Sequence, residues 1–310
     1  LPGATNLSTM ATPTRSFGSV SVAMVTPMNP DGSIDIDSTR ALATELVDSG
    51  CDAIVIHGTT GESPTTHTPE KTEVTVAVVD AVGDRAMVIA GAGSNDTAHA
   101  VRIAEAAHEA GAHGLLVVSP YYNRPSQEGV YRHTLAVVEA TPLPVMLYDI
   151  PGRTGVAFAD DTLDRLAEHP QVQAVKDATG DVAAGFDRMR RTGLDFYSGD
   201  DSLNLAWLVH GASGVVSVVG HVVATEYAAM VAAVDAGDLP AARDISARLA
   251  PVCDALMGGG QGAVMAKAAL ALRGTISHPT VRSPLVEANA VELADLRTAL
   301  MLHGLLEDTH

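Results

Sequence analysis

The sequence is poor in positive charge and poorer still in lysine. Lysine and arginine together number 19 against 37 acidic residues, so the 310-residue chain has a formal net charge of -18. No segment collects the basic residues into a run, and because phosphate groups are bound by clustered positive charge, we expect no nucleic-acid partner. Only Lys71, Lys176 and Lys267 are lysines, which raises the question of what each amine does that an arginine could not do.

Cysteine is also scarce, and long uninterrupted hydrophobic runs are missing. Cys51 and Cys253 match no metal-ligand spacing, so we expect two reduced thiols in a cytoplasmic protein. The longest stretch without Asp, Glu, Lys or Arg, Ser202–Thr225, contains histidines, glycines and polar residues. We expect a helix, a turn and a strand there and no membrane span. Residues 1–16 are expected to form a flexible tail, without a signal peptide.

Hydrophobic residues make up 46% of the chain and charged residues 18%, as in a globular protein with a large core. Short apolar segments alternate with longer amphipathic ones. The strand candidates are Val20–Thr26, Ala53–His57, Met87–Ala90, Gly114–Val118, Val145–Tyr148, Val172–Lys176, Asp195–Ser198 and Gly214–Val218. Each is followed by a helical segment, which predicts a parallel sheet whose apolar strands are covered on both faces.

Eight such units over residues 17–237 predict a (β/α)8 TIM barrel, with an open doubly wound sheet as the alternative from pattern alone. After Gly237 the strand signals stop, and residues 238–310 are expected to form a C-terminal helical domain. Its predicted helices are Pro240–Met257, Gln261–Arg273 and Val291–Leu306. Within the barrel, Asp96 is the expected N-cap of a helix over Asn95–Ala110.

The position of Lys176 distinguishes it from the other two lysines. Active-site residues of such barrels lie at the carboxyl ends of strands, and only Lys176 passes this test, because Lys71 falls in a helix and Lys267 in the C-terminal extension. An amine can lose its proton and attack a carbonyl, whereas a guanidinium cannot. The apolar strand before Lys176 would desolvate the amine and lower its pKa. The alternative is a surface lysine with its charge in water.

Three other strand ends carry candidate functional residues. His57–Ser63 places two glycines around two threonines, a turn whose backbone N–H groups suit a carboxylate or phosphate; an ordinary loop is the alternative. After the fifth strand, Tyr148 could pass protons and Arg153 could grip a carboxylate, unless they are a core tyrosine and a surface arginine. The adjacent Tyr121 and Tyr122 after the fourth strand are expected to serve a subunit interface and the site.

Metal and nucleotide motifs are weak. His108 and His113 are five residues apart, which would put their rings about 140° apart on a helix. The glycines at 91 and 93 begin a dinucleotide fingerprint, but Asp96 occupies the third glycine position. We therefore expect no metal and no dinucleotide.

Four strand-end segments together resemble the dihydrodipicolinate synthase family: GTTGES, PYYNRPSQEG, YDIPGRTG and VKDATG, in this order and spacing. The resemblance extends from about Phe17 to the C-terminal helices. It implies a barrel lyase that condenses pyruvate with L-aspartate 4-semialdehyde to 4-hydroxy-tetrahydrodipicolinate, in the diaminopimelate route to lysine. It also implies a homotetramer and no cofactor, because a lysine serves as the electron sink.

The resemblance assigns catalytic roles by position. Lys176 would form the imine with pyruvate, and Tyr148 would be the general acid and base. Thr59 and Tyr122 would complete a proton relay with Tyr148. Tyr122 would reach in from a neighbouring subunit across a tight dimer.

It also assigns substrate contacts. Thr60 would hold the pyruvate carboxylate, Arg153 would bind the carboxylate of the semialdehyde, and Val216 would offer backbone contacts near pyruvate. Sibling aldolases that act on N-acetylneuraminate or 2-keto-3-deoxy sugar acids share the lysine and tyrosine, but Arg153 favours a small dicarboxylate-like partner. A non-catalytic barrel that binds keto acids is the third alternative, and it would not need an imine-forming amine.

Feedback by lysine is expected to be weak or absent. Lysine-inhibited members of the family carry two histidines and an acid after the GTTGES turn and on the following helix. Thr68, Lys71 and His99 stand at those positions here. Lys71 would place a cation against the ammonium group of bound lysine.

Overall fold

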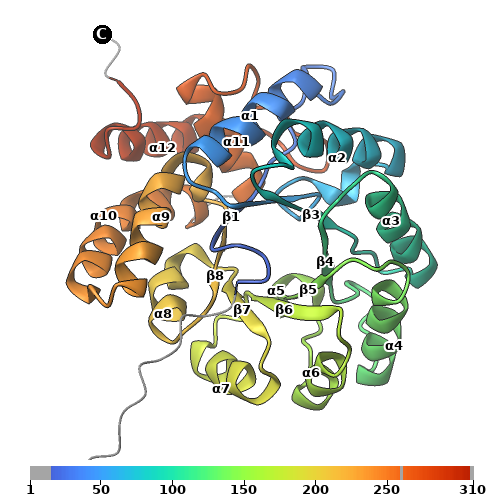
Figure 1. Ribbon diagram of the computed structural model, residues 1–310. Helices are drawn as coiled ribbons and strands as arrows, with labels where there is room; N and C mark the ends of the chain where they lie inside the picture. Colours follow the sequence, from blue (N-terminus) through green and yellow to red (C-terminus); the bar gives the residue numbers. More distant parts are fainter. Residues whose placement is uncertain (1–14, 259–260, 308–310) are drawn as a thin grey trace, which may run out of the picture.

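The computed structural model describes residues 15–258 and 261–307, and they form a closed parallel barrel surrounded by helices (Figure 1). The strands are β1 Val20–Ala23, β2 Ala53–Ile56, β3 Met87–Gly91, β4 Gly114–Val118, β5 Val145–Asp149, β6 Val172–Asp177, β7 Asp195–Ser198 and β8 Gly214–Ser217. Each pairs with its sequence neighbours, and β1 closes the ring by pairing with β8. The barrel prediction is confirmed, and the open sheet is excluded.

Helices follow the strands around the ring, as the alternating pattern predicted (Figure 1). They are α1 Ile36–Asp48, α2 Thr68–Val82, α3 Thr97–Glu109, α4 Gln127–Val138, α5 Pro151–Thr154, α6 Asp160–Ala167, α7 Val182–Thr192, α8 Asn204–Val209 and α9 Gly220–Asp235, with short 3-10 helices η1 Ser63–Thr65 and η2 Asp201–Leu203. Asp96 caps α3 as predicted, accepting hydrogen bonds from the backbone of Ala98 and His99.

Three further helices follow the barrel: α10 Leu239–Met257, α11 Gly262–Arg273 and α12 Ala290–Leu302. In Figure 1 they gather beside α9 and α1. The predicted helix to Leu306 is wrong at its end, because Gly304 takes a left-handed φ of 73° that stops the helix. Leu305 and Leu306 still pack against the core, which explains the apolar pattern that extended the prediction.

The core has two layers, one on each face of the strands. The barrel interior holds Phe17, Ala23, Ala53, Val55, Ile89, Leu116, Met146, Tyr148, Ala174, Tyr197 and Val216. A larger cluster lies between the strands and the helices. Burial on both faces is why the strands are nearly continuous apolar runs, and each fully buried large aliphatic side chain contributes about 1.5–3 kcal/mol.

The charge-free stretch Ser202–Thr225 contains α8, β8 and the start of α9, which agrees with the predicted helix, turn and strand. Within the described residues, none of the helices combines the length and the apolar character that a membrane span requires.

The amino-terminal end of the barrel is closed by the segment that enters it. Residues 1–14 of the predicted tail lie outside the described residues, whereas the Arg15 guanidinium bonds the Asp235 carboxylate at 2.7 Å and Ser16 bonds Asp195. The Phe17 ring is fully buried and meets the Tyr197 ring edge-on at 6.4 Å. This plug lies at the end of the barrel opposite the carboxyl ends of the strands.

Candidate active site

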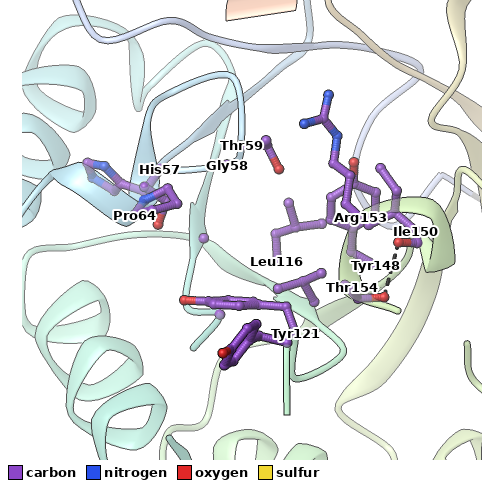
Figure 2. A pocket seen from close by; sticks show the side chains of 15 residues that line it. His57, Gly58, Thr59, Pro64, Leu116, Tyr121, Tyr148, Ile150, Arg153 and Thr154 are labelled. Atoms are coloured by element: carbon purple, nitrogen blue, oxygen red, sulfur yellow. Dashed lines mark hydrogen bonds between the residues drawn. The ribbon is translucent and has the colours of Figure 1, made fainter. Parts of the chain in front are cut away.

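A cavity of about 300 Å³ opens at the carboxyl ends of β2 to β5. Its lining residues are His57, Gly58, Thr59, Ser63, Pro64, Gly91, Gly93, Leu116, Val118, Tyr121, Tyr122, Tyr148, Ile150, Arg153 and Thr154. Figure 2 shows Thr59 and Arg153 on one side of the cavity, with Tyr121 across from them. The cavity therefore lies where barrel enzymes carry their active sites.

Lys176 and Tyr148 are neighbours in the register of β6 and β5. Side chains alternate along a strand, so Lys176 shares the inward face with Ala174, and Tyr148 shares it with Met146, both of which lie in the barrel interior. The Lys176 Nζ lies 4.3 Å from the centre of the Tyr148 ring. The two residues are 5% and 6% exposed, so the amine and the phenol are almost fully removed from water.

Burial lowers the pKa of the Lys176 amine to about 8. The negative charge of Asp201 raises this pKa and the positive charge of Arg153 lowers it, but desolvation is the largest effect. At pH 8 about half of the amine is then neutral, against a very small fraction for an ordinary lysine with a pKa near 10.4. The neutral amine is the nucleophilic form, so Lys176 suits imine formation.

Burial has the opposite effect on Tyr148 and raises its pKa to about 12. The charge of Arg153 and a hydrogen-bonding interaction with Thr59 lower this pKa in part. The hydroxyl is therefore protonated at neutral pH and can donate a proton. To accept one, it needs partners that pass the proton on, and Thr59 is in place for that.

The turn after β2 is tightly folded and strained. The Glu62 amide donates to the Thr59 carbonyl at 3.1 Å, and the Ser63 amide donates to the Gly58 carbonyl at 3.2 Å. His57 and Glu62 have left-handed φ values of 57° and 56°. Each such residue costs about 1–3 kcal/mol, so the turn keeps this shape only because its surroundings hold it.

Arg153 stands at the mouth of the cavity on the four-residue helix α5 and is exposed. It forms no ion pair with the described residues, so its guanidinium is available to an anion. Tyr122 has a left-handed φ of 74° and a side chain that is 87% exposed. Tyr122 thus borders the cavity while most of its ring faces away from its own chain.

The remaining predicted residues lie deeper or farther away. Thr60 is buried in the turn, and Val216 lies in the barrel interior; neither lines the cavity. Lys176 adjoins the cavity through Tyr148. Among the described residues, no group of three or more His, Cys, Asp or Glu is arranged to hold a metal ion.

Comparison with known proteins shows which family the chain belongs to. A sequence model of the dihydrodipicolinate synthetase family matches residues 16–302. The chain belongs to the dihydrodipicolinate synthetase family. A 4-hydroxy-tetrahydrodipicolinate synthase of Kineococcus radiotolerans is 54% identical over 297 residues, 96% of each chain.

Solved structures of this family have the same fold. A dihydrodipicolinate synthase from Cyanidioschyzon merolae, with lysine bound, has a TM-score of 0.90 and 40% identity, covering 94% of this chain and 100% of that one. A chloride-inhibited dihydrodipicolinate synthase from Acinetobacter baumannii, complexed with pyruvate, has a TM-score of 0.90 and 35% identity over the same shares.

One residue of the site, Asp201, escaped the sequence analysis. Its buried carboxylate accepts hydrogen bonds from the Ser217 hydroxyl and from the backbone of Val218 at 2.8 Å and Val219 at 3.0 Å. It thus holds the end of β8 while its charge acts on Lys176. Asp201 lies three residues after the end of β7, so the strand-end rule could have found it.

A second cavity of about 350 Å³ adjoins the first across Tyr121. Thr68, Lys71 and His99 line it, and these are the residues on which the expectation of weak lysine inhibition rests. The Lys71 Nζ donates to the carbonyls of Ser63 and Thr66 at 2.8 and 2.7 Å. Burial lowers the pKa of this amine to about 8.

Proposed function

We propose that Lys176 is the amine that forms an imine with pyruvate in this enzyme. The activity is that of a lyase that condenses pyruvate with L-aspartate 4-semialdehyde to 4-hydroxy-tetrahydrodipicolinate, in lysine biosynthesis. The observation that carries the role of Lys176 is a buried amine with its pKa lowered to about 8, beside the Tyr148 ring at the barrel mouth. The relative complexed with pyruvate supports the substrate.

In the proposed reaction, the neutral amine of Lys176 adds to the C2 carbonyl of pyruvate, and water leaves to give a protonated imine. Loss of a C3 proton gives an enamine. Its C3 attacks the aldehyde carbon of the semialdehyde, and the new alkoxide takes a proton. Exchange of Lys176 for the amino group of the substrate releases the product, so the enzyme amine is regenerated.

Tyr148 is the proposed proton carrier for these steps, with Thr59 and Tyr122 as its relay. Its hydroxyl is a poor base alone at a pKa of about 12. Thr59 contacts it within the chain, and the exposed Tyr122 would extend the relay from a second copy. A chain of hydroxyls lets the proton leave as another arrives, which lowers the barrier to transfer.

Three residues are proposed to bind the substrates. The turn with Thr60 takes the pyruvate carboxylate through its hydroxyl and backbone N–H groups. Arg153 takes the carboxylate of the semialdehyde, since a planar guanidinium binds a carboxylate through two parallel hydrogen bonds. Val216 contributes backbone contacts near pyruvate.

The proposed assembly is a homotetramer in which Tyr122 crosses a tight dimer. A ring that is 87% exposed beside an active-site cavity supports a contact with a second copy. We also propose a cytoplasmic location, which the two free, buried cysteines support.

Weak or absent lysine inhibition is part of the proposal. The amine of Lys71 lies at the second cavity, and a cation there opposes the ammonium group of lysine. The Cyanidioschyzon merolae relative binds lysine, so the difference is expected to come from the residues at positions 68, 71 and 99.

A kinetic assay with alternative substrates tests the activity. Purified enzyme is given pyruvate with L-aspartate 4-semialdehyde, and in parallel N-acetylneuraminate or a 2-keto-3-deoxy sugar acid. We expect turnover with the first pair alone. Turnover of a sugar acid without turnover of the semialdehyde would establish the sibling aldolase instead.

A further inference from the structure

Lys267, the lysine that the strand-end rule set aside, joins the C-terminal helices to the active-site turn. It lies on α11, and its Nζ donates to the Glu62 Oε1 at 2.5 Å and to the Thr280 carbonyl at 2.7 Å. Both side chains of the pair are 0% exposed. A charged contact therefore bridges 205 positions in the sequence, out of reach of water.

Glu62 belongs to the same turn as Thr59 and Thr60. Its second carboxylate oxygen, Oε2, accepts from the Arg282 backbone amide at 2.8 Å, so both oxygens are held by the C-terminal part of the chain. The Glu62 backbone has the left-handed φ of 56° and donates to Thr59. Fixing the Glu62 side chain therefore fixes a strained residue whose amide shapes the turn.

A role in stability alone would not explain this ion pair. Two charges lose their hydration when they are buried, and well-packed apolar side chains of similar volume are often as stabilising. A buried, fully bonded carboxylate does, however, fix direction and distance more strictly than an apolar contact. Further contacts hold the surroundings of the pair in place, because the Arg282 guanidinium binds Glu70 and the Thr65 carbonyl on the segment after the turn.

We propose that Lys267 is a positioning residue for pyruvate binding, acting through Glu62 on the turn that carries Thr59 and Thr60. The inference rests on the proposed role of this turn in holding the pyruvate carboxylate. It makes the C-terminal helical domain part of the machinery that shapes the active site. It also predicts that loss of the pair affects pyruvate more than the semialdehyde, whose proposed partner Arg153 stands on α5, after β5.

The test replaces both members of the pair, Glu62→Gln with Lys267→Met, so that no unpaired charge remains in the buried site. We expect the KM for pyruvate, and the pyruvate concentration that gives half-maximal borohydride trapping on Lys176, to rise at least about tenfold, since small misplacements of binding groups have such effects. The KM for the semialdehyde should stay within about twofold of the wild-type value.

Arg273→Met is the matched control. Arg273 is the last residue of α11, whereas Lys267 lies in the middle of this helix, and the Arg273 guanidinium approaches Glu45 on α1 at 3.9 Å. It is expected to change thermal stability without changing the KM for pyruvate. If the Glu62–Lys267 pair served stability alone, the double variant would likewise change in thermal stability and keep the wild-type KM for pyruvate.

A folded double variant with the wild-type pyruvate KM would overturn the proposal. If the double variant does not fold, the Glu62→Gln variant is measured in the same way. It keeps the shape of the side chain and one acceptor oxygen, and its KM for pyruvate then decides whether the proposal holds. Failure of the proposed function has a different signature, because the wild-type enzyme itself would then give no adduct on Lys176.

Discussion

The Lys176 amine lies 4.3 Å from the centre of the Tyr148 ring, and burial moves the pKa values of the two groups toward different states at neutral pH. The amine loses part of its charge, whereas the phenol keeps its proton. The proposed nucleophile and the proposed proton donor thus stand side by side on adjacent strands. Such a division of roles between neighbouring titratable groups is the pattern expected of acid–base chemistry.

The pH dependence of pyruvate capture reports the Lys176 pKa. The amine reacts only when deprotonated, so kcat/KM for pyruvate should rise with pH and level off above an inflection near pH 8, where burial places the pKa. Asp201 raises this pKa, so Asp201→Asn should move the inflection to lower pH. The measurement is the pH profile of both enzymes.

Asp200→Asn is the control for that experiment. Asp200 precedes Asp201, but its carboxylate accepts from the Ser202 backbone to cap η2, and among the described residues it makes no hydrogen bond to the end of β8. Its profile should match the wild type. An inflection near the pKa of an ordinary lysine in the wild-type enzyme would contradict the lowered pKa of Lys176. A profile in Asp201→Asn that matches the wild type would show that the Asp201 carboxylate does not affect this pKa.

Arg153→Ala should separate the two substrates. Without the guanidinium, the carboxylate of the semialdehyde loses its proposed partner, and turnover should fall by about a hundredfold or more, as when a charged hydrogen bond is removed. The pyruvate adduct on Lys176 should persist. Arg153→Lys keeps the charge but not the planar fork and should recover only part of the rate. An unchanged rate in Arg153→Ala would exclude this residue from the site.

Complementation tests whether Tyr122 acts across subunits. Tyr122→Phe and Lys176→Ala should each be nearly inactive when pure. When the two are unfolded together and refolded, a mixed dimer contains a site with Lys176 from one chain and Tyr122 from the other, so activity should return. Recovery that does not exceed the sum of the separately refolded variants would place Tyr122 within its own chain's site or outside catalysis.

Lysine should inhibit weakly or not at all. The wild-type enzyme is assayed with lysine up to the millimolar range, beside a Lys71→His variant that removes the opposing cation from the second cavity. We expect little effect on the wild type and a stronger one on the variant. Substantial inhibition of the wild type below 1 mM lysine would overturn this view. A dissociation constant in that range corresponds to a binding free energy of about 4 kcal/mol or more.

Local patterns predicted the barrel and which residues stand at the strand ends, because each depends on a few consecutive residues; the roles of those residues stay predictions. Lys176, Tyr148 and Thr59 follow from the rule that such ends face the site. The pairing of Glu62 with Lys267 could not be seen, since it joins segments 205 positions apart. A weak signal existed: Lys267 lies in a helix that is apolar nearly all round, which indicates burial of the amine too.

The end of α12 is a second feature that the sequence pattern predicted incorrectly. The apolar spacing continues through Leu305 and Leu306, but a left-handed glycine at position 304 ends the helix first. Asp201 was overlooked for another reason, because a carboxylate after β7 gave no chemistry of its own until its contacts with the end of β8 were known.

The central claim is imine formation on Lys176, and reductive trapping tests it most directly. The enzyme is incubated with pyruvate and borohydride, digested, and its peptides are mapped by mass spectrometry. The account predicts a reduced pyruvate adduct on the peptide that contains Lys176, absent from Lys176→Ala and absent without pyruvate. No adduct on Lys176, or an adduct on Lys71 or Lys267 instead, would contradict it.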